Sequence, residues 1–187
     1  MIAIIFPFLV SAVVRSYGWM VILGSKGLLN QLLLATGLIQ KPLEIMNTST
    51  AVIVGLVHLL IPYMILAITG VIQGIDQNVE DAAYSLSANP IQTFFRVILP
   101  LSAPGIISGC ILVFTMSMTS YVTPKLLGGT KFRMMSTMVF QEVNINFNWG
   151  LASAISYILL FTILIIPLFA TYATAGVNNK VGGGKRV

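Results

Sequence analysis

Few side chains in this sequence have the types and spacing that chemistry requires. There is one histidine, His58, and one cysteine, Cys110, and both lie inside apolar runs. A metal site needs several nitrogen, sulfur or oxygen ligands close together, and His58 has no cysteine or carboxylate near it in the sequence. Catalysis needs convergent polar groups, such as a nucleophile beside a base, and the sequence has no such pair. The residues therefore predict neither an enzyme nor a bound cofactor or metal.

The sequence also lacks an ATP-binding P-loop. That loop needs a glycine, any four residues, and then Gly-Lys followed by Ser or Thr. Residues 128–131 read Gly-Gly-Thr-Lys, which is the wrong order, and Gly184-Lys185 is followed by Arg186. If ATP drives this protein, we expect another chain to bind the nucleotide.

Composition places these few polar groups in an apolar chain. Of its 187 residues, 57% are hydrophobic and 8% are charged, whereas soluble domains carry about 25% charged residues. A soluble fold with so little charge would expose large apolar patches. The ten Lys and Arg residues are scattered along the chain and form no basic stripe, so we expect no nucleic-acid partner. The composition predicts a protein embedded in a membrane.

Four apolar stretches approach the roughly 20 residues that a bilayer-spanning helix requires. They are Met1–Leu23, Ala51–Gln73, Leu101–Val122 and Leu151–Tyr172. We therefore expect an all-α, polytopic transmembrane bundle over residues 1–175, followed by a flexible tail at 176–187. Arg15 interrupts the first stretch and is expected near a helix end or beside a polar cavity, because a buried arginine is costly in lipid.

Three segments connect these stretches. Residues 24–50 predict a loop that carries a short interfacial helix at Leu28–Leu34. Residues 123–150 are rich in Gly and Asn and predict a loop. Residues 74–100 are polar and predict helices outside the membrane.

The polar segment 74–100 has signals for two short helices. Asp76 or Asn78 can cap the first, and Pro90 can begin the second after a break at Asn89. Leu99-Pro100 is expected to end the second helix. Ala82, Ala83 and Leu86 are expected on one face of the first helix, where small residues permit close approach by a partner. Because the first helix begins acidic, docking to a protein explains it better than binding to lipid does.

This segment resembles the EAA loop of permeases in binding-protein-dependent ABC importers. Asp81-Ala82-Ala83 matches the opening, Ser87 stands where glycine is usual, and Val97-Ile98-Leu99-Pro100 matches the close. The resemblance implies a MetI-like permease core, and it implies that the loop forms helices that dock on a cytoplasmic ATPase. The implied coupling residues are Asp81, Ala82, Ala83, Leu86, Ser87, Leu99 and Pro100. Asn89 is expected to help form the break, since asparagine also adopts positive φ.

The wider chain is similar to the spermidine/putrescine branch of these permeases. The similar stretches are residues 11–19, 27–32 and 121–129. Members usually run longer, so the resemblance implies that N-terminal spans are missing here. It further implies a multi-pass protein of the bacterial inner membrane that imports a polyamine. The implied partners are ATPase subunits that bind the ATP, a second permease subunit, a periplasmic or extracellular solute-binding protein, and lipid.

The resemblance also implies on which side of the membrane the remaining loops lie. If the EAA loop is cytoplasmic, residues 24–50 and 123–150 face outward, and Lys125, Arg133 and Trp149 are candidates for contact with the solute-binding protein. Within the expected spans there is no Asp or Glu. Candidate residues for the solute path are therefore His58 and three aromatic residues able to make cation–π contacts: Tyr63, Phe114 and Tyr121. Ordinary helix packing is the commoner explanation for side chains of these types.

Two other functions are compatible with the sequence. An ion-coupled secondary transporter would need intramembrane carboxylates or broken helices, and the carboxylates are absent. A membrane scaffold without transport activity would suit four spans and a docking loop. Dependence on an ATPase separates the first alternative from an ABC permease, and solute uptake separates the second.

Overall fold

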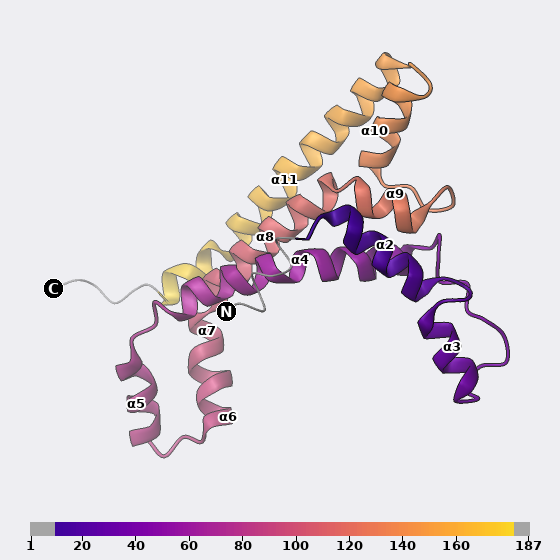
Figure 1. Ribbon diagram of the computed structural model, residues 1–187. Helices are drawn as coiled ribbons and strands as arrows, with labels where there is room; N and C mark the ends of the chain where they lie inside the picture. The colour runs from indigo at the N-terminus through magenta and orange to yellow at the C-terminus, as the bar shows by residue number, and fades with distance from the viewer. Residues whose placement is uncertain (1–9, 182–187) are drawn as a thin grey trace. The chain divides into compact units, whose positions relative to one another are not determined.

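The computed structural model of the chain describes residues 10–181, and its side chains as far as residue 172. Every regular element in this range is helical, which confirms the all-α fold class (Figure 1). The first helices are α2 (Ala12–Leu23), α3 (Leu28–Ala35) and α4 (Ser49–Ile72). The central ones are α5 (Gln77–Ser85), α6 (Pro90–Thr93), the π-helix η1 (Phe94–Ile98), α7 (Leu99–Leu101) and α8 (Ala103–Thr119). The last are α9 (Val122–Gly128), α10 (Met135–Asn144) and α11 (Trp149–Val181).

Two of these helices are by themselves long and apolar enough to cross a membrane. They are Ser49–Ile72 and the part of α11 at Trp149–Tyr172, each 24 residues long. They match the second and fourth predicted spans. Helix α8 has only 17 residues, and it passes the same test only together with Pro90–Leu101, from which it is bent by 60°. The described residues therefore contain two candidate spans, or three if this bent pair is one span.

The first predicted span, Met1–Leu23, is not a single described helix. Ser11 has an extended backbone, and its side chain accepts a hydrogen bond from the Val13 N–H, so Ser11 caps a new helix that is only 12 residues long. Residues 1–9 lie outside the described range. Arg15 lies in the first turn of α2, where its Nε is buried without a hydrogen-bond partner. The position near a helix end agrees with the expectation for this arginine.

The chain forms two compact units. Within the described residues, unit 1 comprises the positions up to Pro62 together with Met116–Thr162, and unit 2 comprises Tyr63–Thr115 together with the positions from Ile163. In unit 1, α2 packs on α9, and the Ser16 and Thr123 hydroxyls, both buried, lie 3.1 Å apart in a hydrogen bond. Leu127 and Val52 are fully buried beside them. A short polar contact thus lies within an apolar core.

The loop at 24–50 is organised around one buried amide. Asn30, on α3, is fully buried. Its Nδ2 donates to the carbonyls of Gly24 at 2.9 Å and Leu43 at 3.0 Å, and its Oδ1 accepts from the Leu43 N–H at 2.7 Å. These bonds fix both flanks of α3, whose presence confirms the predicted helix at Leu28–Leu34.

In unit 2, α4 and α8 approach closely at two glycines of α8. A Cβ on Gly105 would lie 2.9 Å from the Val71 Cβ and 3.2 Å from the Ala67 carbonyl oxygen. A Cβ on Gly109 would lie 2.6 Å from the Met64 sulfur. Small residues let helix backbones meet in this way in membrane proteins. Cys110, the next residue of α8, is exposed.

One prediction from the sequence needs correction in the C-terminal half. The segment 123–150 was predicted as a loop, but it contains α9 and α10. Both helices are short, and glycines and asparagines lie around them. These turn-forming residues therefore dominated the sequence signal, and the two helices were not predicted. Helix α11 continues to Val181, and the flexibility of the tail at 176–187 stays a prediction. Residues 182–187 lie outside the described range.

Candidate functional site

The segment that follows α4 begins with a capped helix. The Asp76 side chain accepts a hydrogen bond from the Asn78 N–H at 2.9 Å, so Asp76 is the N-cap of α5, one of the two candidates for that cap. Glu80 lies in the first turn, where the positive end of the helix dipole favours an acidic side chain. The acidic start of the segment thus stabilises the helix itself.

Ser87 makes the turn that follows α5. Its φ is +60°, a left-handed conformation that glycine adopts without cost and serine does not. The Ala88 N–H then donates to the Ala83 carbonyl at 3.1 Å, which closes the end of the helix. Glycine is usual at this position of the EAA loop and would adopt this conformation readily. Here Ser87 adopts it instead.

Asn89 acts differently from the expectation. Its φ is −78°, so it does not take the left-handed conformation. Instead its side chain accepts from the Gln92 N–H, and the Gln92 side chain accepts from the Asn89 N–H, which forms a capping box at the start of α6. Pro90 occupies the first turn of α6, as predicted. Asn89 therefore starts the second helix.

The second helix does not end at Leu99-Pro100. It passes through the π-helical turn Phe94–Ile98, in which the Leu99 N–H bonds to the Phe94 carbonyl, and continues to Leu101. A proline ring clashes with the carbonyl four residues earlier, here that of Arg96, and a wider turn before Pro100 relieves such a clash. The bend falls later, at Ser102, whose Oγ donates to the Leu99 carbonyl at 2.9 Å.

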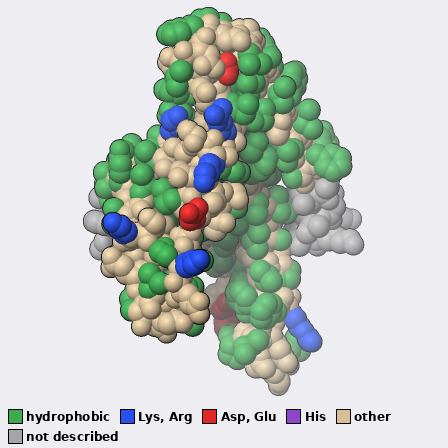
Figure 2. All heavy atoms as spheres, turned by 90° about the vertical axis from the view of Figure 1, so that its right-hand side faces the viewer, with side chains coloured by type: hydrophobic (Ala, Val, Ile, Leu, Met, Phe, Trp, Pro, Cys, Tyr) green, Lys and Arg blue, Asp and Glu red, His purple; other side chains and the backbone are tan. Residues whose placement is uncertain are grey.

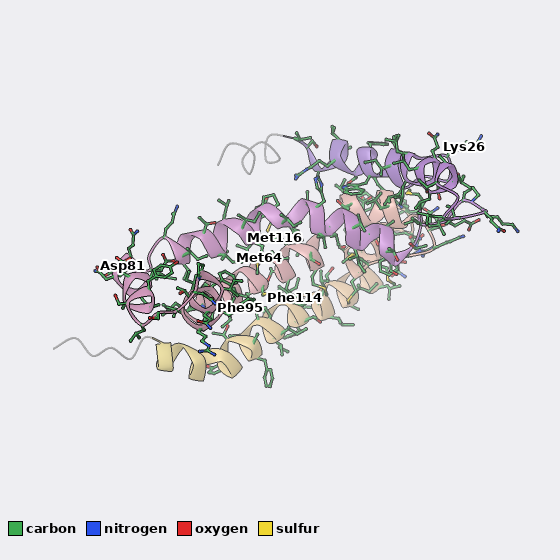
Figure 3. All side chains as sticks on the ribbon, turned by 90° about the horizontal axis from the view of Figure 1, so that it is seen from below. Lys26, Met64, Asp81, Phe95, Phe114 and Met116 are labelled. Carbon is green, nitrogen blue, oxygen red and sulfur yellow. The ribbon has the colours of Figure 1, made fainter. Side chains whose placement is uncertain are left out.

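These elements form a hairpin, defined here as residues 76–101, in which α5 contacts α6 and η1 (Figure 1). Leu86 at its tip is 84% exposed, and Asp81 and Ala82 are also exposed. Asp81 projects from α5 away from the segment that carries Phe95 (Figure 3). Ala83 is only 8% exposed, so it packs inside the hairpin, and the predicted common face of Ala82, Ala83 and Leu86 is not formed.

The second arm of the hairpin presents aromatic side chains. Phe94 and Phe95 are 46% and 61% exposed, and their rings meet edge to face with centroids 5.2 Å apart. They give the second arm an exposed apolar surface, and Leu86 adds an exposed apolar side chain at the tip of the hairpin. Such a surface fits a protein partner, since exposed apolar patches mark interaction sites.

The four candidate path residues do not converge in one place that the structure defines. His58 and Tyr121 belong to unit 1, and Tyr63 and Phe114 to unit 2. His58 is exposed and meets the edge of Trp19, with ring centroids 5.5 Å apart. Tyr121 packs on Phe140 with centroids 4.3 Å apart and planes at 31°. Their role in a solute path stays a prediction.

Two hollows that sequence reasoning missed lie within unit 1, beside α10 and α11. One has a volume of about 390 Å³ and the other about 470 Å³, and both are lined by Val143 and Ser156. Together they form the α10–α11 groove, whose aromatic lining consists of Tyr121, Phe140, Trp149 and Tyr157. A signal for it exists in the sequence, because Trp149, Ser153, Ser156 and Leu160 follow helical spacing.

Charged groups are sparse around these features. On the face seen in Figure 2, the Lys and Arg side chains are separated from one another by uncharged atoms. Among the residues that the structure describes, no group of three or more His, Cys, Asp and Glu residues is placed to hold a metal ion.

Comparison with known proteins agrees with this architecture. A family model described as "Binding-protein-dependent transport system inner membrane component" matches residues 1–178. The chain therefore belongs to this family of inner-membrane transport components.

Among its relatives are two proteins named spermidine/putrescine transport system permease protein PotB. The one from Haemophilus influenzae is 42% identical over 95% of this chain and 62% of its own length. The one from Escherichia coli strain K12 is 37% identical over 95% of this chain and 65% of its own length. The chain thus spans somewhat less than two thirds of the length of these relatives.

A solved structure shares the fold. It is the crystal structure of a bacterial ABC transporter involved in the import of the acidic polysaccharide alginate, with a TM-score of 0.71 and 16% sequence identity. The match covers 92% of this chain and 63% of the other. It supports the MetI-like permease fold and, at this identity, nothing about the solute.

Proposed function

We propose that this chain is the membrane-spanning permease subunit of an ABC importer that carries a polyamine, such as spermidine or putrescine, across the bacterial inner membrane. The observation that carries the proposal is the capped hairpin 76–101, which stands between apolar helices and exposes Asp81, Ala82 and Leu86. Family membership and the printed names of the PotB relatives support the transport role and the choice of solute.

In this proposal the chain has no enzymatic activity and binds no cofactor of its own. Separate cytoplasmic ATPase subunits bind and hydrolyse ATP, and the hairpin docks on them. A second permease subunit completes the solute path, and a solute-binding protein delivers the polyamine from outside. Transport requires that the docked ATPase favours one permease state when ATP is bound and another after hydrolysis, because tight binding alone shifts no equilibrium.

The test is co-purification of the chain, in detergent, with the ATPase encoded in the same cell. Asp81→Arg reverses an exposed charge, and Leu86→Ser removes the most exposed apolar side chain of the hairpin. We expect both substitutions to reduce ATPase retention at least about tenfold, as expected when an interface hot spot worth about 1.4 kcal/mol or more is lost. Ala83 is not substituted, because a larger side chain at this buried position would disturb folding.

Thr130→Arg is the matched control. Thr130 is exposed in the loop between α9 and α10, and the substitution adds a positive charge away from the hairpin. It should leave ATPase retention unchanged. Equal retention by all variants would show that the hairpin is not the docking element. Polyamine uptake that continues without the ATPase would favour the ion-coupled transporter, and retention without any solute uptake would favour the scaffold.

A further inference from the structure

The three serine hydroxyls of the α10–α11 groove donate their hydrogens to backbone carbonyls. The Ser153 hydroxyl donates to the Gly150 carbonyl at 2.8 Å, and the Ser156 hydroxyl donates to the Ala152 carbonyl at 2.8 Å. Ser136 donates in the same way to the Ser120 carbonyl. A hydroxyl has one hydrogen and two lone pairs. These three oxygens can therefore offer a ligand only acceptor positions.

The amide in the groove adds to this pattern. One Nδ2 hydrogen of Asn144 is donated to the Phe140 carbonyl at 3.0 Å, and its Oδ1 is a further acceptor. No Lys, Arg, Asp or Glu side chain lines either hollow. The nearest carboxylate on the same helix, Glu142, accepts from the Asn146 side chain at 2.9 Å and does not line the groove.

Aromatic rings supply the rest of the polar character. Tyr121 and Phe140 line one hollow, Trp149 and Tyr157 line the other, and Tyr157 is 63% exposed. Ring faces carry partial negative charge and attract cations. The remaining lining includes Val139, Val143, Leu159 and Leu160, which suit methylene groups.

We infer that the α10–α11 groove is a binding site for alkylammonium groups, at which the amines of a polyamine meet hydroxyl oxygens and ring faces while its methylene chain lies on the aliphatic residues. A primary ammonium has three donors and no acceptor, so it can donate to the serine oxygens and to the Asn144 Oδ1 of this lining. The inference rests on the proposed function and adds residues to it.

Uptake of labelled putrescine by the complete transporter in proteoliposomes tests this site. Tyr157→Leu should raise the KM for uptake about tenfold, since a cation–π contact of about 1.4 kcal/mol corresponds to that factor. Tyr157→Phe keeps the ring face and the serine oxygens, so the KM should stay within about twofold of the native value by the same reasoning. Phe140→Leu provides a second variant with the same expected direction. Butanediol, which has the same chain length without ammonium groups, should not compete with putrescine.

Tyr17→Leu is the control variant, because Tyr17 is an exposed tyrosine of the same unit and lies outside the groove. Each variant is first checked for normal co-purification with its partners. A native KM in both Tyr157→Leu and Phe140→Leu would overturn the groove site and leave the proposed function intact. Competition by butanediol equal to that by unlabelled putrescine would overturn the ammonium chemistry. Absence of ATP-dependent polyamine uptake by the native transporter would remove the proposed function and this inference together.

Discussion

At the scale of single residues, Ser87 shows how one position carries a conformational cost. It is one of three non-glycine residues with positive φ in the described range, with Asn47 and Phe147. The left-handed conformation brings the Cβ of an ordinary residue close to the following carbonyl. Ser87 therefore adopts a backbone conformation that serine disfavours. The capping box at Asn89 and the hydrogen bond from the Ala88 N–H to the Ala83 carbonyl must offset that conformational cost.

Replacing Ser87 with glycine should stabilise the hairpin by roughly 0.5–1 kcal/mol, because glycine accepts positive φ without strain. Hydrogen–deuterium exchange of the amides in residues 77–101 is the measurement, and exchange should slow. Ser85→Gly is the matched control. Ser85 is the last helical residue of α5, where glycine lowers helix stability by up to about 0.5 kcal/mol, so exchange should become faster. Faster exchange in Ser87→Gly would contradict the assigned turn geometry.

Asn30 is the second residue whose change has a defined outcome. Asn30→Ala removes three hydrogen bonds and leaves the Leu43 N–H and two carbonyls without that partner. We expect a loss of about 3 kcal/mol, within the range for buried groups left unsatisfied. Thermal unfolding in detergent measures it. Gln31→Ala removes one exposed bond to the Lys26 carbonyl and should cost under about 0.5 kcal/mol. Equal effects of the two substitutions would contradict the structural role of Asn30.

At the scale of elements, the approach of α8 to α4 differs between its two glycines. At Gly105 an added methyl group meets the Val71 Cβ and the Ala67 carbonyl oxygen, neither of which can move freely. At Gly109 it meets the sulfur of Met64, near the end of a flexible side chain (Met64 is labelled in Figure 3). Gly105 is therefore the tighter contact, although Gly109 has the shorter distance.

Gly105→Ala should destabilise the protein by about 1–3 kcal/mol, as overpacking typically does, and Gly109→Ala should cost less. The midpoint of thermal unfolding in detergent is the measurement. Gly70→Ala is the control, because no atom lies within 4 Å of a Cβ built there. It should be neutral or stabilising by up to about 1 kcal/mol, since alanine favours helix more than glycine does. A larger loss at Gly109 than at Gly105 would contradict this packing.

The elements that could be predicted from the sequence are those with strong local signals. Continuous apolar runs predicted α4 and most of α11, and the cap residue Asp76 and the helix-starting Pro90 predicted where the hairpin helices begin. Helices α9 and α10 were missed because they are short and lie between glycines and asparagines. The π-helical turn was not predicted, because a proline such as Pro100 can either end a helix or be accommodated by a wider turn before it. The local sequence does not distinguish these two outcomes.

The candidate site was predictable to the same extent. The coupling hairpin follows from contiguous residues, so its outline could be predicted, while the burial of Ala83 depends on contacts with the second arm. The α10–α11 groove joins residues from three separate segments. Of its aromatic residues, the sequence singled out Tyr121 for the solute path and Trp149 for contact with the solute-binding protein, without bringing the two together. Hydrogen bonds between distant residues, such as the one between Ser16 and Thr123, are invisible to periodicity arguments.

At the scale of the whole molecule, the two long apolar helices differ in how much protein covers them. One third of the hydrophobic window of α4 is buried within the chain, against 6% of that of α11. Exposed leucine, isoleucine and phenylalanine side chains along α11 must therefore contact lipid or another subunit. The apolar exterior of this helix is what ties the chain to a membrane.

Leu164→Lys should reduce membrane insertion, because a lysine near the centre of a spanning helix costs about 2.5–3.5 kcal/mol. Leu164 is 50% exposed on α11. The fraction of the chain that resists carbonate extraction from membranes is the measurement. Leu38→Lys is the control, since Leu38 is 73% exposed between α3 and α4, outside the two long apolar helices. Equal extraction of both variants would argue against α11 as a span.

The single cysteine of the chain offers a reporter that needs no engineering. Cys110 is exposed on α8, one residue after the glycine that contacts Met64. A maleimide that dissolves only in water and one that enters lipid would label this thiol at different rates, according to which medium surrounds it. Labelling before and after ATP is added to the assembled transporter would then record whether water reaches the middle of α8 during the transport cycle.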